Sequence, residues 1–425
     1  MTDSKSSFAT AYNNLNKEQK LAVDTIDGPL LVLAGPGTGK TQLLSARVAN
    51  ILRKTDIAPS NILCLTFTES GAANMRRRLR EFIGEASYEV TISTYHSFGS
   101  DIIKSHSEYF QQIGLDRTDD VRLERAIDEL AQIRIVEEIL GKLPFDSLLL
   151  SARYFVKDVV STISDLKKNL ITPQALYELG TNNLRQIDSA QIVIDEVINQ
   201  VGGISRKKDQ WPSQYATLLE RLSTLSGSLV EQAAGELKLA FDEYEESSSS
   251  TPLTKWKNAW LHKDDKDKFT LTKRATSEKM VDLSSVYESY EQALRVEASY
   301  DFDDMILRAI DGVKNSDELR FNLQERYQYI LLDEFQDTNL AQFELVKRIA
   351  DHPVHEGRPN VMAVGDDDQA IFAFQGANVG NIQDFLESFS DVVVINLVSN
   401  YRSHRDVLHV AQNIASQISG RLHTK

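Results

Sequence analysis

A glycine-rich segment near the start of the sequence carries residues that suit phosphate binding. An apolar run that ends in Ala34 leads into Gly35-Pro36-Gly37-Thr38-Gly39-Lys40-Thr41. Backbone N–H groups of such a turn point at phosphate oxygens, and its glycines let the backbone come close to them. The lysine adds a positive charge beside the β and γ phosphates, and the threonine hydroxyl can ligate Mg²⁺. The segment therefore predicts a triphosphate site with Lys40 as a catalytic residue and Thr41 as a metal ligand.

The flanks of this segment support the same interpretation. A strict phosphate-loop pattern has glycine where this chain has Ala34, and alanine is small enough to fit the turn. An apolar strand precedes the loop, and residues 42–49 favour a helix. A glycine-rich turn without a ligand is the alternative, but it would not need a strand before it and a helix after it.

Two later segments place carboxylates and an amide at the ends of apolar runs. Asp333 and Glu334 directly follow residues 329–332, and Gln369 follows the run at 361–364. Ligands of open α/β sheets bind at the carboxyl ends of the strands, so these side chains should lie beside the phosphate loop. We expect Asp333 to reach Mg²⁺, Glu334 to polarise the attacking water, and Gln369 to sense the γ-phosphate.

The elements that would position these residues recur at both ends of the chain. Short apolar or β-branched runs alternate with helical patterns near both termini, which is typical of a parallel sheet. The runs lie at residues 30–34, 61–68, 90–95, 329–332, 361–364 and 392–395. The stretch at 106–294 is instead long, helical and rich in Leu, Glu, Lys and Ala. The sequence thus predicts an α/β fold whose parallel sheet is interrupted by a large all-helical insertion.

Composition narrows the class of protein. The 425 residues are 41% hydrophobic and 26% charged, as in an ordinary globular protein, with room for about two or three domains. The net charge of −15 means that any polyanion site must be a local basic region on an acidic body. Cys64 is the only cysteine, which excludes an internal disulfide, and we expect it to pack in the core. Without a signal-peptide pattern or a run of about 18 apolar residues, we expect a cytoplasmic protein with no membrane partner.

In their amino-acid sequences and in their order along the chain, these segments resemble the motifs of the UvrD/Rep/PcrA-type superfamily 1 DNA helicases. The resemblance covers nearly the whole chain outside the helical middle. The resemblance implies a RecA-like P-loop NTPase fold with ATP and Mg²⁺ as cofactors. It also implies that Gln19 reads the adenine edge, Tyr401 stacks on adenine and Arg402 reaches the γ-phosphate. The matching segments are the Q motif (15–22) and motifs I (34–41), Ia (65–75), Ib (91–98), II (333–339), III (365–378) and IV (397–403).

By the same resemblance, motifs Ia, Ib and III supply contacts to single-stranded DNA. Aromatic side chains stack on bases of any sequence, while small polar and basic groups follow the backbone. Each aromatic could equally be a core residue. Only for Phe67, His96 and Phe374 does the position within a motif strongly favour a contact with DNA. The arginines at 76–80 fan around a helix, so a solvated face is an equal alternative to a phosphate site. The candidate DNA contacts are Phe67, Thr68, Tyr95, His96, Ser97, Phe372 and Phe374.

The resemblance also suggests the domains and their limits. It implies a first motor domain at 1–105 plus 295–390, a helical 1B insertion at 106–294, and the start of a second RecA-like domain at 391–425. The chain ends before motifs V and VI, so we expect a fragment. Three positions depart from the family pattern: Gln42 stands where arginine is common, Phe372 where tyrosine is usual, and Gln375 where arginine is usual.

The leading hypothesis is the N-terminal part of an ATP-dependent 3′–5′ DNA helicase or translocase, with an ATPase stimulated by single-stranded DNA. Its partners would be single strands and single-strand/duplex junctions in DNA repair, replication or recombination. One alternative is a nucleotide-gated DNA-binding or scaffold protein without motor activity, which the presence of Lys40 and Glu334 disfavours. Another is the motor part of a helicase–nuclease.

Overall fold

The protein divides into two units, and each is described by itself. The computed structural model describes residues 2–110, 125–145, 147–204, 211–264, 266–366 and 380–415. The sheet unit comprises Met1–Ile127, Ser164–Leu170 and Tyr300–Lys425, and the helical unit comprises Asp128–Ile163 and Ile171–Ser299. None of the helices in the described ranges is long and apolar enough to cross a membrane.

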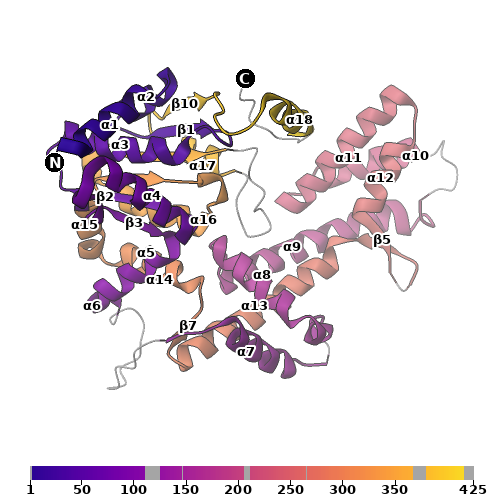
Figure 1. Ribbon diagram of the computed structural model, residues 1–425. Helices are drawn as coiled ribbons and strands as arrows, with labels where there is room; N and C mark the ends of the chain where they lie inside the picture. The colour runs from indigo at the N-terminus through magenta and orange to yellow at the C-terminus, as the bar shows by residue number, and fades with distance from the viewer. Residues whose placement is uncertain are drawn as a thin grey trace. The chain divides into compact units, whose positions relative to one another are not determined.

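The sheet unit is built on six parallel strands in the order β10-β1-β9-β8-β2-β3. Strands from the indigo and purple N-terminal part and from the orange and yellow C-terminal part therefore share one sheet (Figure 1). This arrangement confirms the predicted α/β fold. The strands are β1 (Leu30–Ala34), β2 (Ile62–Thr66), β3 (Thr91–Thr94), β8 (Tyr329–Leu332), β9 (Val361–Gly365) and β10 (Val393–Leu397).

Helices cover both faces of this sheet, because central parallel strands are apolar on both sides. Along β1, Leu30 and Val32 enter one core while Leu31 enters the other, as the two-residue period of a strand requires. The first core is closed by α1 (Thr2–Asn13), α2 (Lys17–Asp24), α3 (Lys40–Lys54) and α4 (Glu69–Ile83). The second is closed by α5 (Tyr95–Ser105), α14 (Asp304–Asn315), α15 (Asp317–Arg326), α16 (Leu340–Ala350) and α17 (Asn381–Ser388).

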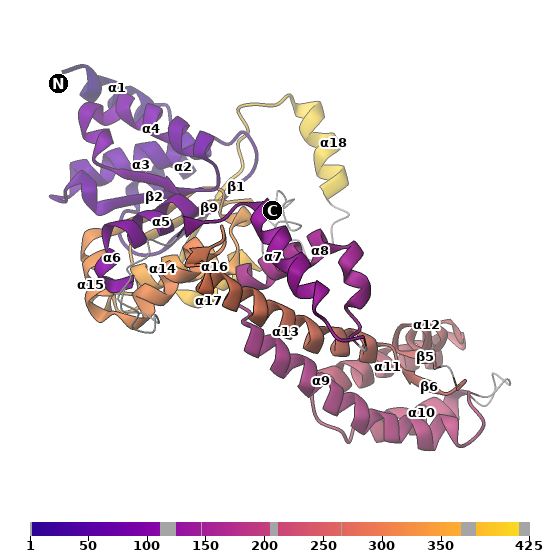
Figure 2. The ribbon, with the colours of Figure 1, turned by 90° about the horizontal axis from the view of Figure 1, so that it is seen from below.

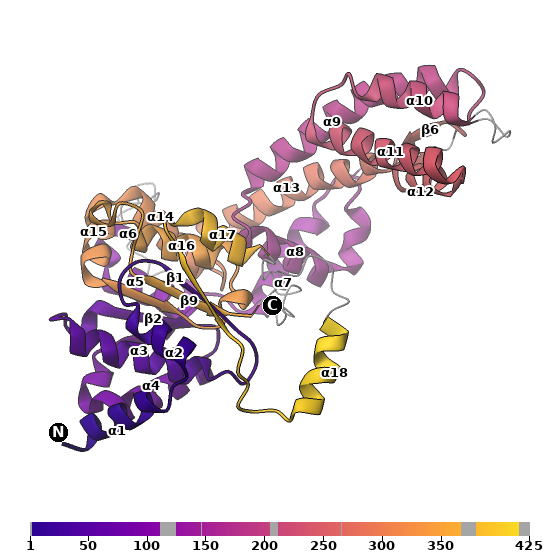
Figure 3. The same ribbon diagram turned by 90° about the horizontal axis from the view of Figure 1, so that it is seen from above.

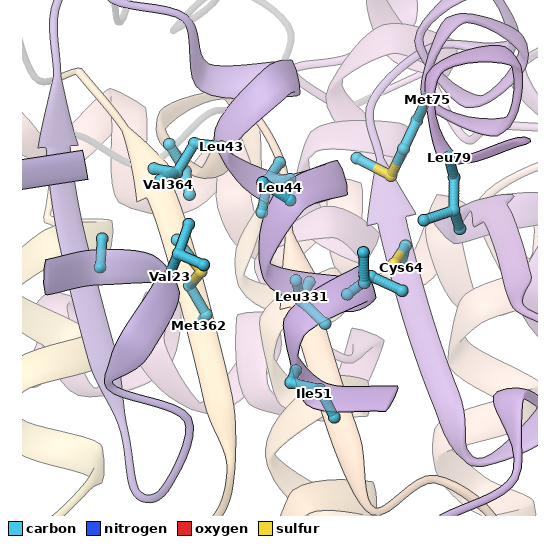
Figure 4. Close-up of a cluster of buried hydrophobic side chains, with 14 of the residues drawn as sticks. Val23, Leu43, Leu44, Ile51, Cys64, Met75, Leu79, Leu331, Met362 and Val364 are labelled. Atoms are coloured by element: carbon cyan, nitrogen blue, oxygen red, sulfur yellow. The ribbon is translucent and has the colours of Figure 1, made fainter. Parts of the chain in front are cut away.

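Figure 4 shows the first of these cores, where side chains of α2, α3 and α4 meet the strands. Cys64 lies there with no exposed surface, which confirms its expected role in core packing. Burial raises the pKa of its thiol well above the ordinary value, so the side chain is an inert apolar group. The sheet unit also contains α6 (Ser107–Phe110) and α18 (Arg405–Ala415), and β4 (Arg125–Ala126) pairs with β7 (Ser299–Tyr300).

In the helical unit, α9 packs along α13 (Figures 2 and 3). A separate core gathers apolar side chains of α9 to α12, with Trp211, Trp256 and Trp260 buried in it. The helices are α7 (Glu129–Gly141), α8 (Val156–Lys168, whose last turn belongs to the sheet unit), α9 (Pro173–Ile194), α10 (Trp211–Leu222), α11 (Ser228–Ser247), α12 (Thr251–Trp260) and α13 (Lys273–Val296).

The insertion is not all-helical, and this part of the prediction is wrong. Strands β5 (Leu261–Lys263) and β6 (Phe269–Leu271) form an antiparallel hairpin within residues 255–274, a stretch of the sequence that is rich in lysine and aspartate. Leu261 and Leu271 face each other across it and bury into the core of the unit. At the turn, the Asp264 carboxylate accepts backbone N–H bonds of 2.9 Å from Lys266 and from Lys268. Such local side-chain bonds compete with helix, which is why a charged tract can turn back here.

The contacts in the structure divide the chain differently at two predicted boundaries. The resemblance implies a second domain from residue 391, whereas β10 pairs with β1 in parallel, with Leu30 opposite Val393 and Ala34 opposite Leu397. Its Ile395 and Leu397 bury in the sheet core, which holds the strand in the first sheet. Ser164–Leu170, expected in the insertion, belongs to the sheet unit.

A buried ion cluster explains the second boundary. Lys167 is 1% exposed, and its Nζ lies 2.7 Å from Asp301 Oδ2 and 2.7 Å from Asp304 Oδ1. The backbone N–H of each aspartate also donates a 3.0 Å bond to the carboxylate of the other, at the start of α14. A charge taken out of water needs such partners, so Lys167 fixes its segment to the loop before α14.

We expect Lys167→Met to lower the free energy of unfolding by about 3–5 kcal/mol, because it leaves two buried carboxylates without their cation. Its neighbour Lys168 is the matched control, since its ion pair with Asp165 is 3.6 Å long and partly exposed. Lys168→Met should change stability by less than about 1 kcal/mol. Urea unfolding of both variants is the measurement, and equal losses would contradict the assignment.

Candidate nucleotide-binding site

The phosphate loop connects the end of β1 to the start of α3 and depends on two glycines. Gly37 and Gly39 have φ values of 73° and 88°, in the left-handed region that favours glycine. A Cβ atom on Gly37 would lie only 2.6 Å from Cβ of Arg402. The loop therefore needs glycine for its conformation and for the close approach of a second segment, and it presents the N-terminus of α3, where anions bind.

The predicted base-binding residues are held against this loop. Gln19 forms a capping box with Asn16 at the start of α2, and its Nε2 donates a 2.8 Å bond to the carbonyl of Thr38. The backbone N–H of Tyr401 donates to the carbonyl of Gly37 at 2.9 Å, and its hydroxyl accepts a 3.0 Å bond from Asn16. The Tyr401 ring is 65% exposed, so one of its faces is available to a flat ligand.

Lys40 meets Glu334 directly, although 294 residues separate them. Lys40 Nζ lies 2.6 Å from Glu334 Oε2, and Gln336 Nε2 donates to the same oxygen at 2.8 Å. Glu334 has a φ of 49°, an uncommon backbone conformation for a residue other than glycine. The tight turn after β8 thus aims the carboxylate at the phosphate loop.

Asp333 is a buried carboxylate in a negatively charged neighbourhood. It is 5% exposed, and its Oδ1 accepts the backbone N–H of Glu334 at 3.0 Å. Burial and, secondarily, the charge of Glu334 raise the pKa of Asp333 to about 6, against the opposing effect of Lys40. Burial and Glu334 likewise raise the pKa of Asp337 to about 6. A cation bound nearby would lower the pKa of both carboxylates.

The donor set at this edge suits Mg²⁺. Thr41 and Asp333 offer hard oxygen ligands, and Mg²⁺ is ordinarily held by one or two carboxylates with substrate phosphates and water. Within the described ranges, no three His, Cys, Asp or Glu side chains are grouped so as to hold a metal by themselves. Two protein oxygens would leave the other coordination positions of Mg²⁺ to phosphates and water.

Arg402 belongs to a turn that is folded onto the loop. The Asn400 side chain donates to the carbonyl of Pro36 and accepts the backbone N–H groups of Arg402 and Ser403, each at 2.8 Å. Sequence analysis missed Asn400, although it lies inside motif IV next to the predicted residues. It also missed Gln336 and Asp366, whose 3.1 Å bond joins the turns after β8 and β9. Their sequence signals were their places after apolar runs and within motifs II and III.

Of the predicted DNA contacts, Thr68 and Ser97 are exposed and take part in local structure. Thr68 caps α4 by accepting a 3.0 Å bond from Gly71 N–H. The Ser97 hydroxyl donates to Glu69 at 3.0 Å, and this bond ties motif Ib to motif Ia. Phe67 is half-buried and directly follows the end of β2. Gln369, Phe372 and Phe374 lie outside the described residues.

Tyr95 is a correction to the predicted DNA contacts. It is 1% exposed in the core of the sheet unit, and its hydroxyl lies 3.3 Å from that of Thr338. Burial raises the pKa of its phenol above the ordinary range. A base cannot stack on a side chain that is covered on all sides, so Tyr95 is a packing residue.

His96 is half-buried and stacks on Phe302, with ring centroids 3.8 Å apart and planes at 21°. Its buried Nε2 has no hydrogen-bond partner among the described residues. Burial and, to a lesser degree, the charge of Lys168 lower the pKa of His96 to about 4. Phe302 is 55% exposed, so the two rings form a platform that a flat ligand can reach.

The fold and the loop geometry define a RecA-like P-loop protein. The family model described as the UvrD/REP helicase N-terminal domain matches residues 15–390. The chain therefore belongs to the UvrD/REP helicase family, which confirms the resemblance drawn from its motifs.

Two curated relatives illustrate the match. The chain is 27% identical over 408 residues to the ATP-dependent DNA helicase PcrA of Staphylococcus epidermidis. It is 27% identical over 409 residues to the protein of the same name in Staphylococcus aureus. Each comparison covers 96% of this chain but 41% of the relative, so the chain spans about two fifths of their length.

His96 should make stability depend on pH. Its folded pKa of about 4 lies below the ordinary 6.5, so the unfolded chain binds more protons between these values. The free energy of unfolding should fall by roughly 1–3 kcal/mol as pH drops through this window. Urea unfolding at pH 7 and pH 4.5 should show a smaller loss in His96→Gln than in the unchanged protein. The exposed His262, changed to Gln, is the control and should keep the full loss.

Proposed function

We propose that this chain is the nucleotide-binding part of an ATP-dependent DNA helicase. The observation that carries the proposal is the 2.6 Å pair between Lys40 of the phosphate loop and Glu334 after β8. It brings a phosphate-binding cation and a candidate catalytic base to one edge of the sheet. The relatives are ATP-dependent DNA helicases by name, which supports the same assignment.

The chemistry follows from the charges at this edge. A bound triphosphate would draw Lys40 from Glu334 to its own oxygens and free that carboxylate to orient and deprotonate a water. Thr41 and Asp333 would hold Mg²⁺, which supplies positive charge to the phosphates. Arg402 would add charge at the γ-phosphate, where Gln369 would sense it. Gln19 and Tyr401 would hold the base.

The finer features of this proposal rest on the family resemblance. They are movement 3′ to 5′, an ATPase stimulated by single-stranded DNA, a preference for single strands and junctions, and work in DNA repair, replication or recombination. We further propose that the sheet unit is the first motor domain and the helical unit its 1B insertion. A cytoplasmic location stays a prediction, supported by the single buried cysteine.

Glu334→Gln and Lys40→Ala should separate binding from turnover. Removing the base should leave ATP bound while hydrolysis falls by about 10²–10⁴. Removing the lysine should weaken ATP binding itself. Lys54→Ala is the matched control on α3, because its partner Asp24 lies away from the loop. Titration with a fluorescent ATP analogue and a phosphate-release assay measure the two effects, and an unchanged protein that binds no nucleotide would refute the proposal.

DNA binding should depend on the two half-buried aromatics of motifs Ia and Ib and not on the fully buried one. Phe67→Ala and His96→Ala should each weaken binding to an oligo-dT strand by about 1–3 kcal/mol, the usual value of one stacked base. Tyr95→Phe keeps the packed ring and should bind as the unchanged protein does. Fluorescence anisotropy of a labelled strand gives these affinities, and if Tyr95→Phe alone weakened binding, our assignment of this surface would be wrong.

A further inference from the structure

A basic pocket lies beside the phosphate loop, and half of the residues that line it, Arg77, Arg78 and Glu81, belong neither to the motifs nor to the proposed mechanism. It has a volume of about 580 Å³ and is lined by Thr41, Asn74, Arg77, Arg78, Glu81 and Arg402. Four of these residues come from α4. Met75 and Leu79 bury the inner face of that helix in the sheet core (Figure 4), which fixes its outer arginines in place.

The charges around this pocket are unbalanced. Three guanidinium groups and one carboxylate line it, which leaves an excess of two positive charges on a chain of net charge −15. Among the residues that the structure describes, Arg77, Arg78 and Arg402 form no ion pair. Arg77 donates to the side chain of Asn74, which is neutral and compensates no charge. Like charges gathered without counter-ions are stabilised when an anion enters between them.

The position of the pocket identifies the anion. Thr41 lies in the phosphate loop, and Cβ of Arg402 lies 2.6 Å from where a Cβ of Gly37 would be. The pocket therefore shares Thr41 with the phosphate loop, and its Arg402 is packed against that loop. Guanidinium groups bind phosphate oxygens through two parallel N–H bonds, so two exposed arginines at this wall favour a phosphate group.

We propose that Arg77 and Arg78 form, with Arg402, a second anion site beside Thr41, which binds a phosphate group of the nucleoside triphosphate. This inference rests on the proposed function, because it needs a nucleotide in the phosphate loop. It adds α4 to the nucleotide site, although the same helix begins with the segment assigned to DNA. A backbone phosphate of DNA is the competing ligand, and the shared wall of Thr41 and Arg402 favours the nucleotide.

The experiment compares the double variant Arg77→Gln/Arg78→Gln with Arg80→Gln. Arg80 is on the same helix, but its guanidinium donates to the Tyr88 hydroxyl at 3.2 Å and does not line the pocket. All three side chains are exposed, so the variants should fold and unfold like the unchanged protein. The probes are a fluorescent ATP analogue and a labelled oligo-dT strand.

We expect the double variant to bind the ATP analogue roughly tenfold more weakly, or worse, with its affinity for oligo-dT unchanged. Arg80→Gln should bind both probes as the unchanged protein does. Equal ATP affinity in the double variant and the Arg80→Gln control would overturn the inference while leaving the proposed function intact. A loss of oligo-dT binding alone would also overturn it and assign the arginines to DNA. If the unchanged protein bound no ATP analogue, the proposed function and this inference would fail together.

Discussion

The central constraint on this protein is that a parallel sheet must be covered on both faces. Each crossover between parallel strands places a helix on one face, so two apolar layers enclose the sheet. The strand order inserts β9 and β8 between β1 and β2, although they lie hundreds of residues later in the chain. The carboxyl ends of β1, β8 and β9 therefore meet at one edge. All the nucleotide chemistry proposed above depends on that meeting.

At this edge the carboxylates are buried although burial disfavours their charged form, and this opposition prepares the site for a cation. Asp333, Asp337 and Asp366 are all less than a tenth exposed, and Lys40 is the cation that reaches Glu334 among them. Water cannot screen these carboxylates fully, so the pKa values of Asp333 and Asp337 rise. A site with excess buried negative charge favours a divalent cation. The phosphate loop and the arginines on its other side favour an anion, and a metal–nucleotide complex supplies both.

The same balance explains how an acidic chain would accommodate the polyanions that we propose as its ligands. Charge is arranged locally: α4 buries Met75 and Leu79 and carries its arginines outward, while carboxylates dominate elsewhere. Lys167, by contrast, is used inside the protein, where two aspartates surround it. Whether a basic residue binds a ligand or holds the fold therefore depends on the partners that tertiary structure provides.

The sequence by itself determined the phosphate loop, the strands that carry the site, and the parallel α/β class. These features depend on glycines, on apolar runs and on the polar residues that end those runs, and a short window of sequence contains all of them. Only the tertiary structure decided that Tyr95 is buried, that β10 joins the first sheet, and that residues 261–271 turn back as a hairpin. It also decided that Lys40 pairs with Glu334 and that Arg77 and Arg78 share a pocket with Arg402. Burial and long-range partners depend on how the helices close over the sheet, and no local pattern carries that information.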